Sequence, residues 1–278
     1  MKDKSFIPAL TGIRALCVYF IFFYHLNFFS PEKEPALHCI FDQFYTFLTF
    51  FFVLSGFVIC HKYYGISSLK KKDLYNYFIN RISRVFPILI LLISITFLLG
   101  YRQGLYGSGA NTVKLYLLNI TLFKGFSSEY YLTGIGPSWS MSVEELFYTL
   151  SPLIFLYTKK VSSLIKFVLI FYGIGILLTF IFTQHPFEGF FSSYIFTGYT
   201  TFFGRIFEFA CGIFLAMLVK EKYQSRLLKK IGARSLYIGL IIIVISIALL
   251  YSVAQHYQAF HAHDTWPGLA VNNLLMPV

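Results

Sequence analysis

The stretch RALCVYFIFFYH, residues 14–25, places an arginine and a histidine at the two ends of ten almost wholly apolar residues. The surrounding apolar run, residues 8–29, is long enough to cross a bilayer as a helix, which takes about 20 residues. Inside a membrane an ionisable side chain is costly and usually functional, so both end groups need an explanation. This stretch therefore predicts a transmembrane helix and also a site.

The composition agrees with a membrane protein. The chain has 278 residues, of which 57% are hydrophobic and 13% are charged, and its mean hydropathy is +0.67. Soluble domains have about 25% charged and 45–50% apolar residues. We therefore predict an all-α, polytopic transmembrane bundle of about seven to nine spans, forming one membrane-embedded domain over residues 1–278.

The apolar runs set this count. An eighth run begins near residue 268 and stops at the last residue, so we expect that C-terminal helices are missing. The other runs cover residues 8–29, 41–60, 85–101, 140–157, 163–183, 200–219 and 235–253.

The basic residues predict the orientation. Lys and Arg concentrate in residues 61–84, 158–166 and 220–234, and alternate connections are poor in cations. Because cytoplasmic loops of membrane proteins are rich in Lys and Arg, we expect a multi-pass protein of the inner or plasma membrane with a cytoplasmic N-terminus. The same bias explains the net charge of +11 without a nucleic-acid partner. The same alternation requires residues 102–138 to cross the membrane either twice or not at all. Their apolar piece, residues 112–123, is too short to cross, which favours no crossing.

Arg14 and His25 share one face of their helix. Eleven residues at 100° each rotate about 20° past three full turns and advance about 16 Å. Arg14 could be only a snorkelling anchor, and His25 only a core histidine bonded to a neighbouring helix. A neutral imidazole in a wet cavity, however, can remove a proton from an alcohol.

Two further features carry less specific signals. Ser55-Gly56 interrupts a bulky span, and a small pair allows close approach of a ligand or, as we favour from sequence, of another helix. Arg81 and Arg84 precede the third span, with Pro87 in its first turn. Their spacing puts both on one face, which suits phosphate binding as well as anchoring at the membrane surface.

The stretch GPSWSMSVEELFYTLSPLIF, residues 136–155, places two carboxylates at the start of a span. Ser142 and Glu145 fit a capping box, so Glu145 has a structural explanation. Glu144 is left without a local task, and its carboxylate could orient an imidazole, act as a base or bind a polar substrate.

Two later groups are ambiguous. Arg205 and Glu208 are three residues apart in another span, where an intrahelical salt bridge is the alternative to a functional role. A loop near the C-terminal end carries His256, His261, His263 and Asp264. Because a His-x-His pair without a secure fourth ligand is a weak signal, we expect no metal site.

Five segments resemble, in order, the motifs of the acyltransferase 3 family. They are IPALTGIRALCVYFIFFYHL, FFFVLSGFVI, RISRVFP, GPSWSMSVEELFYTLSPL and RIFEFACGIFLAML, and they run from Ile7 to Leu218. The family comprises integral membrane acyltransferases typified by the bacterial O-antigen acetylase, which O-acylate surface polysaccharides. Its members usually continue through two or three further spans, whereas this sequence stops inside its eighth apolar run. Because of this departure, a non-catalytic membrane fragment is one alternative.

The resemblance implies a reaction. An acyl group, usually acetyl, would pass from cytoplasmic acyl-coenzyme A across the bilayer to a carbohydrate hydroxyl, with no permanently bound cofactor. Direct transfer and a covalent acyl-enzyme are both open. A transporter or flippase is the rival function, since intramembrane charges can also line a path.

The resemblance also implies roles for particular residues. His25 resembles the family's catalytic histidine, Arg14 its partner, and Glu144 the acidic end of the W-S-x-S-x-E motif. The pair Arg81 and Arg84 resembles the family's R-x-x-R pair, and Ser55-Gly56-Phe57 resembles its S-G-F motif; both are expected to bind the acyl donor. Four other residues of the matching segments are expected to bind the substrate. The expected donor-binding residues are Arg81, Arg84, Ser55 and Gly56, and the expected substrate-binding residues are Trp139, Ser140, Arg205 and Glu208.

Overall fold

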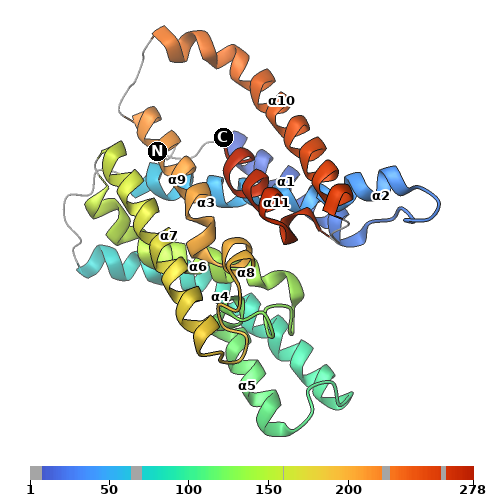
Figure 1. The fold of residues 1–278 in the computed structure, drawn as a ribbon. Helices are drawn as coiled ribbons and strands as arrows, with labels where there is room; N and C mark the ends of the chain where they lie inside the picture. Colours follow the sequence, from blue (N-terminus) through green and yellow to red (C-terminus); the bar gives the residue numbers. More distant parts are fainter. Residues whose placement is uncertain (1–7, 64–70, 159, 221–225, 258–260) are drawn as a thin grey trace. The chain divides into compact units, whose positions relative to one another are not determined.

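The computed structural model describes residues 8–63, 71–158, 160–220, 226–257 and 261–278 (Figure 1). Within these ranges the chain forms helices joined by turns, and the only β-type pairing is an isolated bridge between Ser127 and Phe190. The all-α prediction is therefore confirmed.

Each of the seven predicted apolar runs forms a helix. The helices are α1 (Pro8–Leu26), α3 (Phe47–Tyr63), α4 (Lys71–Arg102), α6 (Trp139–Tyr157), α7 (Val161–Gln184), α9 (Phe202–Lys220) and α10 (Arg226–Tyr257). In the described residues, 5 helical segments are long and apolar enough to cross a membrane. They are Pro35–Tyr63, Lys71–Arg102, Val161–Gln184, Tyr194–Val219 and Tyr237–Tyr257. The protein is a multi-pass membrane protein.

The segment between α4 and α6 contains one short helix, α5 (Gly109–Ile120). Its 12 residues rise about 18 Å, well short of a hydrocarbon core of about 30 Å. Its length agrees with the prediction that residues 102–138 make no crossing. The other short helices are α2 (Pro35–Asp42), α8 (Tyr194–Thr200) and α11 (Trp266–Ala270).

The predicted start of the third span was wrong. Helix α4 begins at Lys71, so Pro87 lies in its interior instead of its first turn. Arg81 and Arg84 consequently lie inside a continuous helix and not in a connection ahead of it. Hydropathy marks only the apolar part of a helix, whereas the polar residues before it also include good helix formers.

The chain divides into two compact units, which are described separately below. The first unit contains residues 1–64 and 205–278, and the second contains residues 65–204. The first unit thus holds α1, α2, α3, α10, α11 and most of α9, and the second holds α4 to α8.

In the first unit, glycines bring the backbones of α3 and α9 into contact. A Cβ added at Gly56 would collide with the carbonyl oxygen of Phe209, and one at Gly212 would collide with the carbonyl oxygen of Val53. Small residues permit such close approach of membrane helices. Gly56 therefore has the helix-packing role that the sequence favoured, and its assignment to the donor stays a prediction.

We expect Gly56→Val to lower the stability of the protein by about 1–3 kcal/mol, because the added side chain must separate two packed backbones. Thermal unfolding of purified protein in detergent measures the effect. Gly173→Val in α7 is the matched control, since a Cβ at Gly173 meets nothing within 4 Å. Equal unfolding temperatures for the two variants would contradict the assigned packing role.

In the second unit, α4 and α5 enclose an apolar cluster. It consists of Leu89, Ile93, Phe97, Leu115 and Leu122. The loop before α6 is fixed by Lys124, whose buried Nζ donates to the carbonyl oxygens of Thr133 at 2.6 Å and Ile135 at 2.8 Å. Burial lowers the pKa of Lys124 to about 8, so its amine is still mainly protonated at pH 7. This lysine holds the chain in place immediately before the predicted substrate motif.

Candidate functional site

Helix α1 carries Arg14 and His25 without interruption, so the expected three-turn spacing between them applies. His25 lies in the last turn and its side chain is exposed. Arg14 is half-buried, and its Nε atom is buried without a hydrogen-bond partner among the described residues. An orphaned guanidinium donor of this kind is available to an anionic or carbonyl ligand.

In the second unit, Arg81 on α4 and Glu144 on α6 both contact the side chain of Tyr148. The Arg81 guanidinium lies over the ring of Tyr148, 4.5 Å from its centroid, and the Tyr148 hydroxyl donates to Glu144 Oε1. Glu144 thus has a local partner, which corrects the sequence interpretation that it had no local task. Arg81 also attracts the neighbouring carboxylate of Glu145 electrostatically.

Tyr148 is itself firmly held. It is buried, and its backbone carbonyl accepts from the hydroxyl of Tyr77 at 3.0 Å. Tyr77 also exchanges a hydrogen bond with Ser151 at 2.8 Å. This packing fixes the tyrosine that links a predicted donor-binding arginine to a predicted catalytic carboxylate.

The capping-box interpretation was wrong. Helix α6 begins at Trp139 with Ser138 at the N-cap, so Ser142 lies inside the helix. The Ser142 side chain is buried against Gly125 and cannot cap the helix. The sequence reading failed because the two preceding residues of the motif, Trp139 and Ser140, already extend the helix.

The other residues predicted at the substrate or the donor vary in exposure. Trp139 is buried and its ring lies 5.3 Å from that of Tyr199. The Ser140 hydroxyl donates to the carbonyl of Pro137 at 3.0 Å. Ser55 is fully buried in α3, whereas Arg84 on α4 is exposed. Their predicted ligand contacts stay predictions.

Arg205 and Glu208 form a buried ion pair in the first unit. Arg205 Nη1 lies 2.7 Å from Glu208 Oε1, and both side chains are 0% exposed. The salt-bridge alternative from the sequence is therefore confirmed. The guanidinium also lies 5.3 Å from the centroid of the Phe52 ring, so an aromatic face covers part of the cation.

Three residues from other parts of the chain complete this pair. Asn273 Oδ1 accepts from Arg205 at 2.5 Å and from Asn272 at 2.8 Å. The hydroxyl of Thr49 on α3 donates to Glu208 at 3.2 Å. We call Thr49, Arg205, Glu208, Asn272 and Asn273 the buried polar network.

Comparison with known proteins identifies the family of the chain. A family model described as an acyltransferase domain matches residues 7–276. The chain belongs to the acyltransferase 3 family. It is similar to the peptidoglycan O-acetyltransferase OatA of Listeria monocytogenes serovar 1/2a, with 26% identity over 275 residues. The match covers 93% of this chain and 41% of that relative's length. No solved structure matches the chain.

The acyltransferase 3 match includes every predicted site residue, and these residues fall in both units. Arg14, His25 and the buried polar network belong to the first unit, and Arg81 and Glu144 belong to the second. The hypothesis that Glu144 orients His25 therefore stays a prediction.

Sequence reasoning on this acyltransferase domain missed Tyr148 and the partners of the buried ion pair. Tyr148 had a usable signal, because it follows Glu144 by four residues and so lies on the same helical face. Asn272 and Asn273 are an adjacent pair of polar side chains inside the last apolar run, but nothing in their spacing points to Arg205.

Proposed function

We propose that the protein transfers an acyl group, in the first instance acetyl, from acyl-coenzyme A to a hydroxyl of a cell-surface or exported carbohydrate. The observation that carries this proposal is the placement of Arg14 and His25 on one uninterrupted helix within a family match over residues 7–276. An exposed histidine at the end of a helix can act as a general base, and an arginine three turns away can bind an anion.

In this reaction His25 acts as the general base. Its neutral imidazole takes the proton of the acceptor hydroxyl, and the hydroxyl oxygen attacks the thioester carbonyl. The tetrahedral intermediate then collapses, the carbon–sulfur bond breaks, and the departing thiolate takes the proton from the imidazolium. The products are an ester and free coenzyme A, and the histidine returns to its neutral form.

The donor is proposed to bind through arginines. Coenzyme A carries several phosphate groups, and planar guanidinium groups bind phosphate through paired, charge-assisted hydrogen bonds. In the second unit, Arg84 is exposed and the Arg81 guanidinium lies over the ring of Tyr148, 4.5 Å from its centroid. These two side chains supply the positive charge for the donor in our proposal.

The acceptor is proposed to be a glycan outside the membrane barrier. The Listeria relative is named for O-acetylation of peptidoglycan, so peptidoglycan is the first acceptor to test. With the N-terminus in the cytoplasm, as the distribution of basic residues predicts, the donor binds on the cytoplasmic side and the ester forms on the other.

A vesicle assay tests the proposal. Inside-out membrane vesicles that contain the protein receive acetyl-coenzyme A labelled in its acetyl group, with peptidoglycan fragments enclosed in the lumen. We expect labelled ester on the fragments, released by mild base, and none in vesicles without the protein. Mass spectrometry of the fragments should show the mass of one acetyl group.

The same assay separates the rival function. A transporter or flippase would move label or substrate into the lumen without forming an ester. Label that enters without a base-labile product would therefore overturn the acyltransferase proposal. Label on the fragments from other acyl donors, such as succinyl-coenzyme A, would instead identify the acyl group that the protein prefers.

A further inference from the structure

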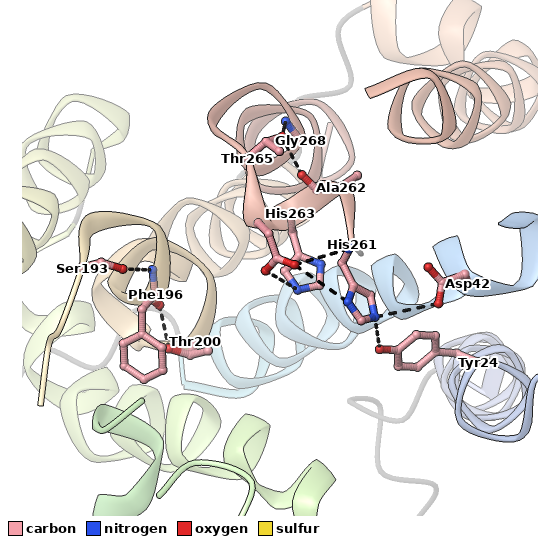
Figure 2. Close-up of polar contacts among 11 residues, drawn as sticks. Tyr24, Asp42, Ser193, Phe196, Thr200, His261, Ala262, His263, Thr265 and Gly268 are labelled. Carbon is pink, nitrogen blue, oxygen red and sulfur yellow. Dashed lines mark hydrogen bonds and ion pairs between the residues drawn. The ribbon is translucent and has the colours of Figure 1, made fainter. Parts of the chain in front are cut away.

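The turn before α11 gathers histidine and aspartate side chains from separate parts of the first unit. His261, His263 and Asp264 each offer one ligand atom, and these atoms all lie within 4.8 Å of one another. Asp42, at the end of α2, faces His261 from the other side (Figure 2). The sequence could not show this approach, because Asp42 is remote along the chain.

The distances between the Asp264 oxygens and the two imidazole nitrogens are closer to the spacing of ligand atoms around a metal ion than to hydrogen-bond lengths. Asp264 Oδ1 lies 3.7 Å from His263 Nε2, and Asp264 Oδ2 lies 3.9 Å from His261 Nδ1. Both are longer than hydrogen bonds, which rarely exceed about 3.2 Å. Ligand atoms around a tetrahedral zinc ion stand about 3.3–3.6 Å apart. The two Asp264 pairs are therefore only a few tenths of an ångström too long, whereas the widest separation in the group, which is up to 4.8 Å, would have to shorten by roughly 1 Å when the ion binds.

The second ring nitrogen of His261, Nε2, already has polar partners. It lies 2.9 Å from the Tyr24 hydroxyl and 3.8 Å from Asp42 Oδ1 (Figure 2). The Nδ1 atom of His261 lies 3.9 Å from Asp264 Oδ2. Histidines that bind metals usually direct their second ring nitrogen to a carboxylate or another polar group, which fixes the ring orientation. Tyr24 and Asp42 have the right chemistry and position for this supporting role.

Hydrogen bonds with the backbone hold the turn that carries the three ligands. Asp264 Oδ2 accepts from the backbone amide of His261 at 3.3 Å, and Thr265 caps the following helix by accepting from Gly268 at 3.2 Å. The ring of Tyr45 packs against His263 with centroids 4.5 Å apart. The side chain of Asp264 is 53% exposed, so an ion has a path to the ligands from solvent.

From this geometry we propose that His261, His263 and Asp264 bind a divalent transition-metal ion, with Tyr24 and Asp42 orienting His261. Two imidazoles and one carboxylate form a common donor set for zinc, with a fourth position left for water. This proposal departs from the sequence expectation of no metal site, and it does not depend on the acyl-transfer activity.

Zinc titration of the full chain tests the proposal. The untagged protein, stripped with a chelator in detergent, is titrated with Zn²⁺ against a chromophoric competitor, and bound metal is counted by mass spectrometry. We expect about one Zn²⁺ per chain, lost in His261→Ala and His263→Ala and retained in His256→Ala. His256 is the matched control because it lies at the end of α10, outside the cluster.

Two further measurements distinguish a loss of metal binding from misfolding of the histidine variants. Asp42→Asn and Tyr24→Phe keep the ligands and should weaken Zn²⁺ binding by about 10–100-fold. Co²⁺ bound to the native chain should give the visible absorption of a low-coordinate site, which His263→Ala should remove at unchanged helical content by circular dichroism. Unchanged zinc stoichiometry in both histidine variants, or no binding by the native chain, would overturn the proposal.

Discussion

Replacing His25 by alanine is expected to lower the rate of acyl transfer by about 10²–10⁴-fold, the contribution typical of a general base. The loss should appear in kcat, because the side chain acts on the reacting proton and is not proposed to bind the donor. The variant should still fold, since the side chain is exposed at the end of α1. The measurement is labelled-ester formation in inside-out vesicles at saturating acetyl-coenzyme A.

His185→Ala provides the matched control for this experiment. His185 is an exposed histidine that follows the last turn of α7 in the second unit, and no role is proposed for it. Its replacement should leave the rate unchanged. A His25→Ala variant with the native rate would remove histidine catalysis from the proposed mechanism, even if ester formation by the native protein is demonstrated.

The sequence was sufficient to predict which segments are helices across most of the chain. An apolar run of about 20 residues has few alternatives to a helix, because every backbone polar group in a bilayer must be satisfied within the segment. It was less informative about where the helices begin. Helix α4 starts at Lys71 and α10 at Arg226, both in more polar sequence that hydropathy does not mark as helical.

Contacts between distant residues were beyond sequence reasoning. Thr49 and Glu208 are 159 positions apart, and Tyr24 and His261 are 237 positions apart. The spacing rules for helices connect residues three or four positions apart, so they identified the pair Arg205 and Glu208 but none of its remote partners. The same limitation hid the approach of Asp42 to the histidines.

The buried polar network gives the largest expected effect on stability. Replacing Glu208 by leucine should destabilise the protein by about 3–5 kcal/mol, because it leaves the Arg205 guanidinium buried without its counter-charge. Asn273 would still accept from the guanidinium, but an amide oxygen cannot neutralise its charge. Thermal unfolding in detergent, with circular dichroism as the readout, measures the loss.

The double variant Arg205→Met/Glu208→Leu separates a structural pair from a substrate-binding one. Apolar side chains of similar volume need no counter-charge, so the double variant should recover most of the stability lost in Glu208→Leu. If the pair only supports the fold, labelled-ester formation should recover together with the unfolding temperature. If the pair also contacts substrate, as the sequence predicted, the double variant should be stable yet slow, with a raised KM for the acceptor. A double variant no more stable than Glu208→Leu would contradict the assignment of this pair as a mutually compensating buried charge.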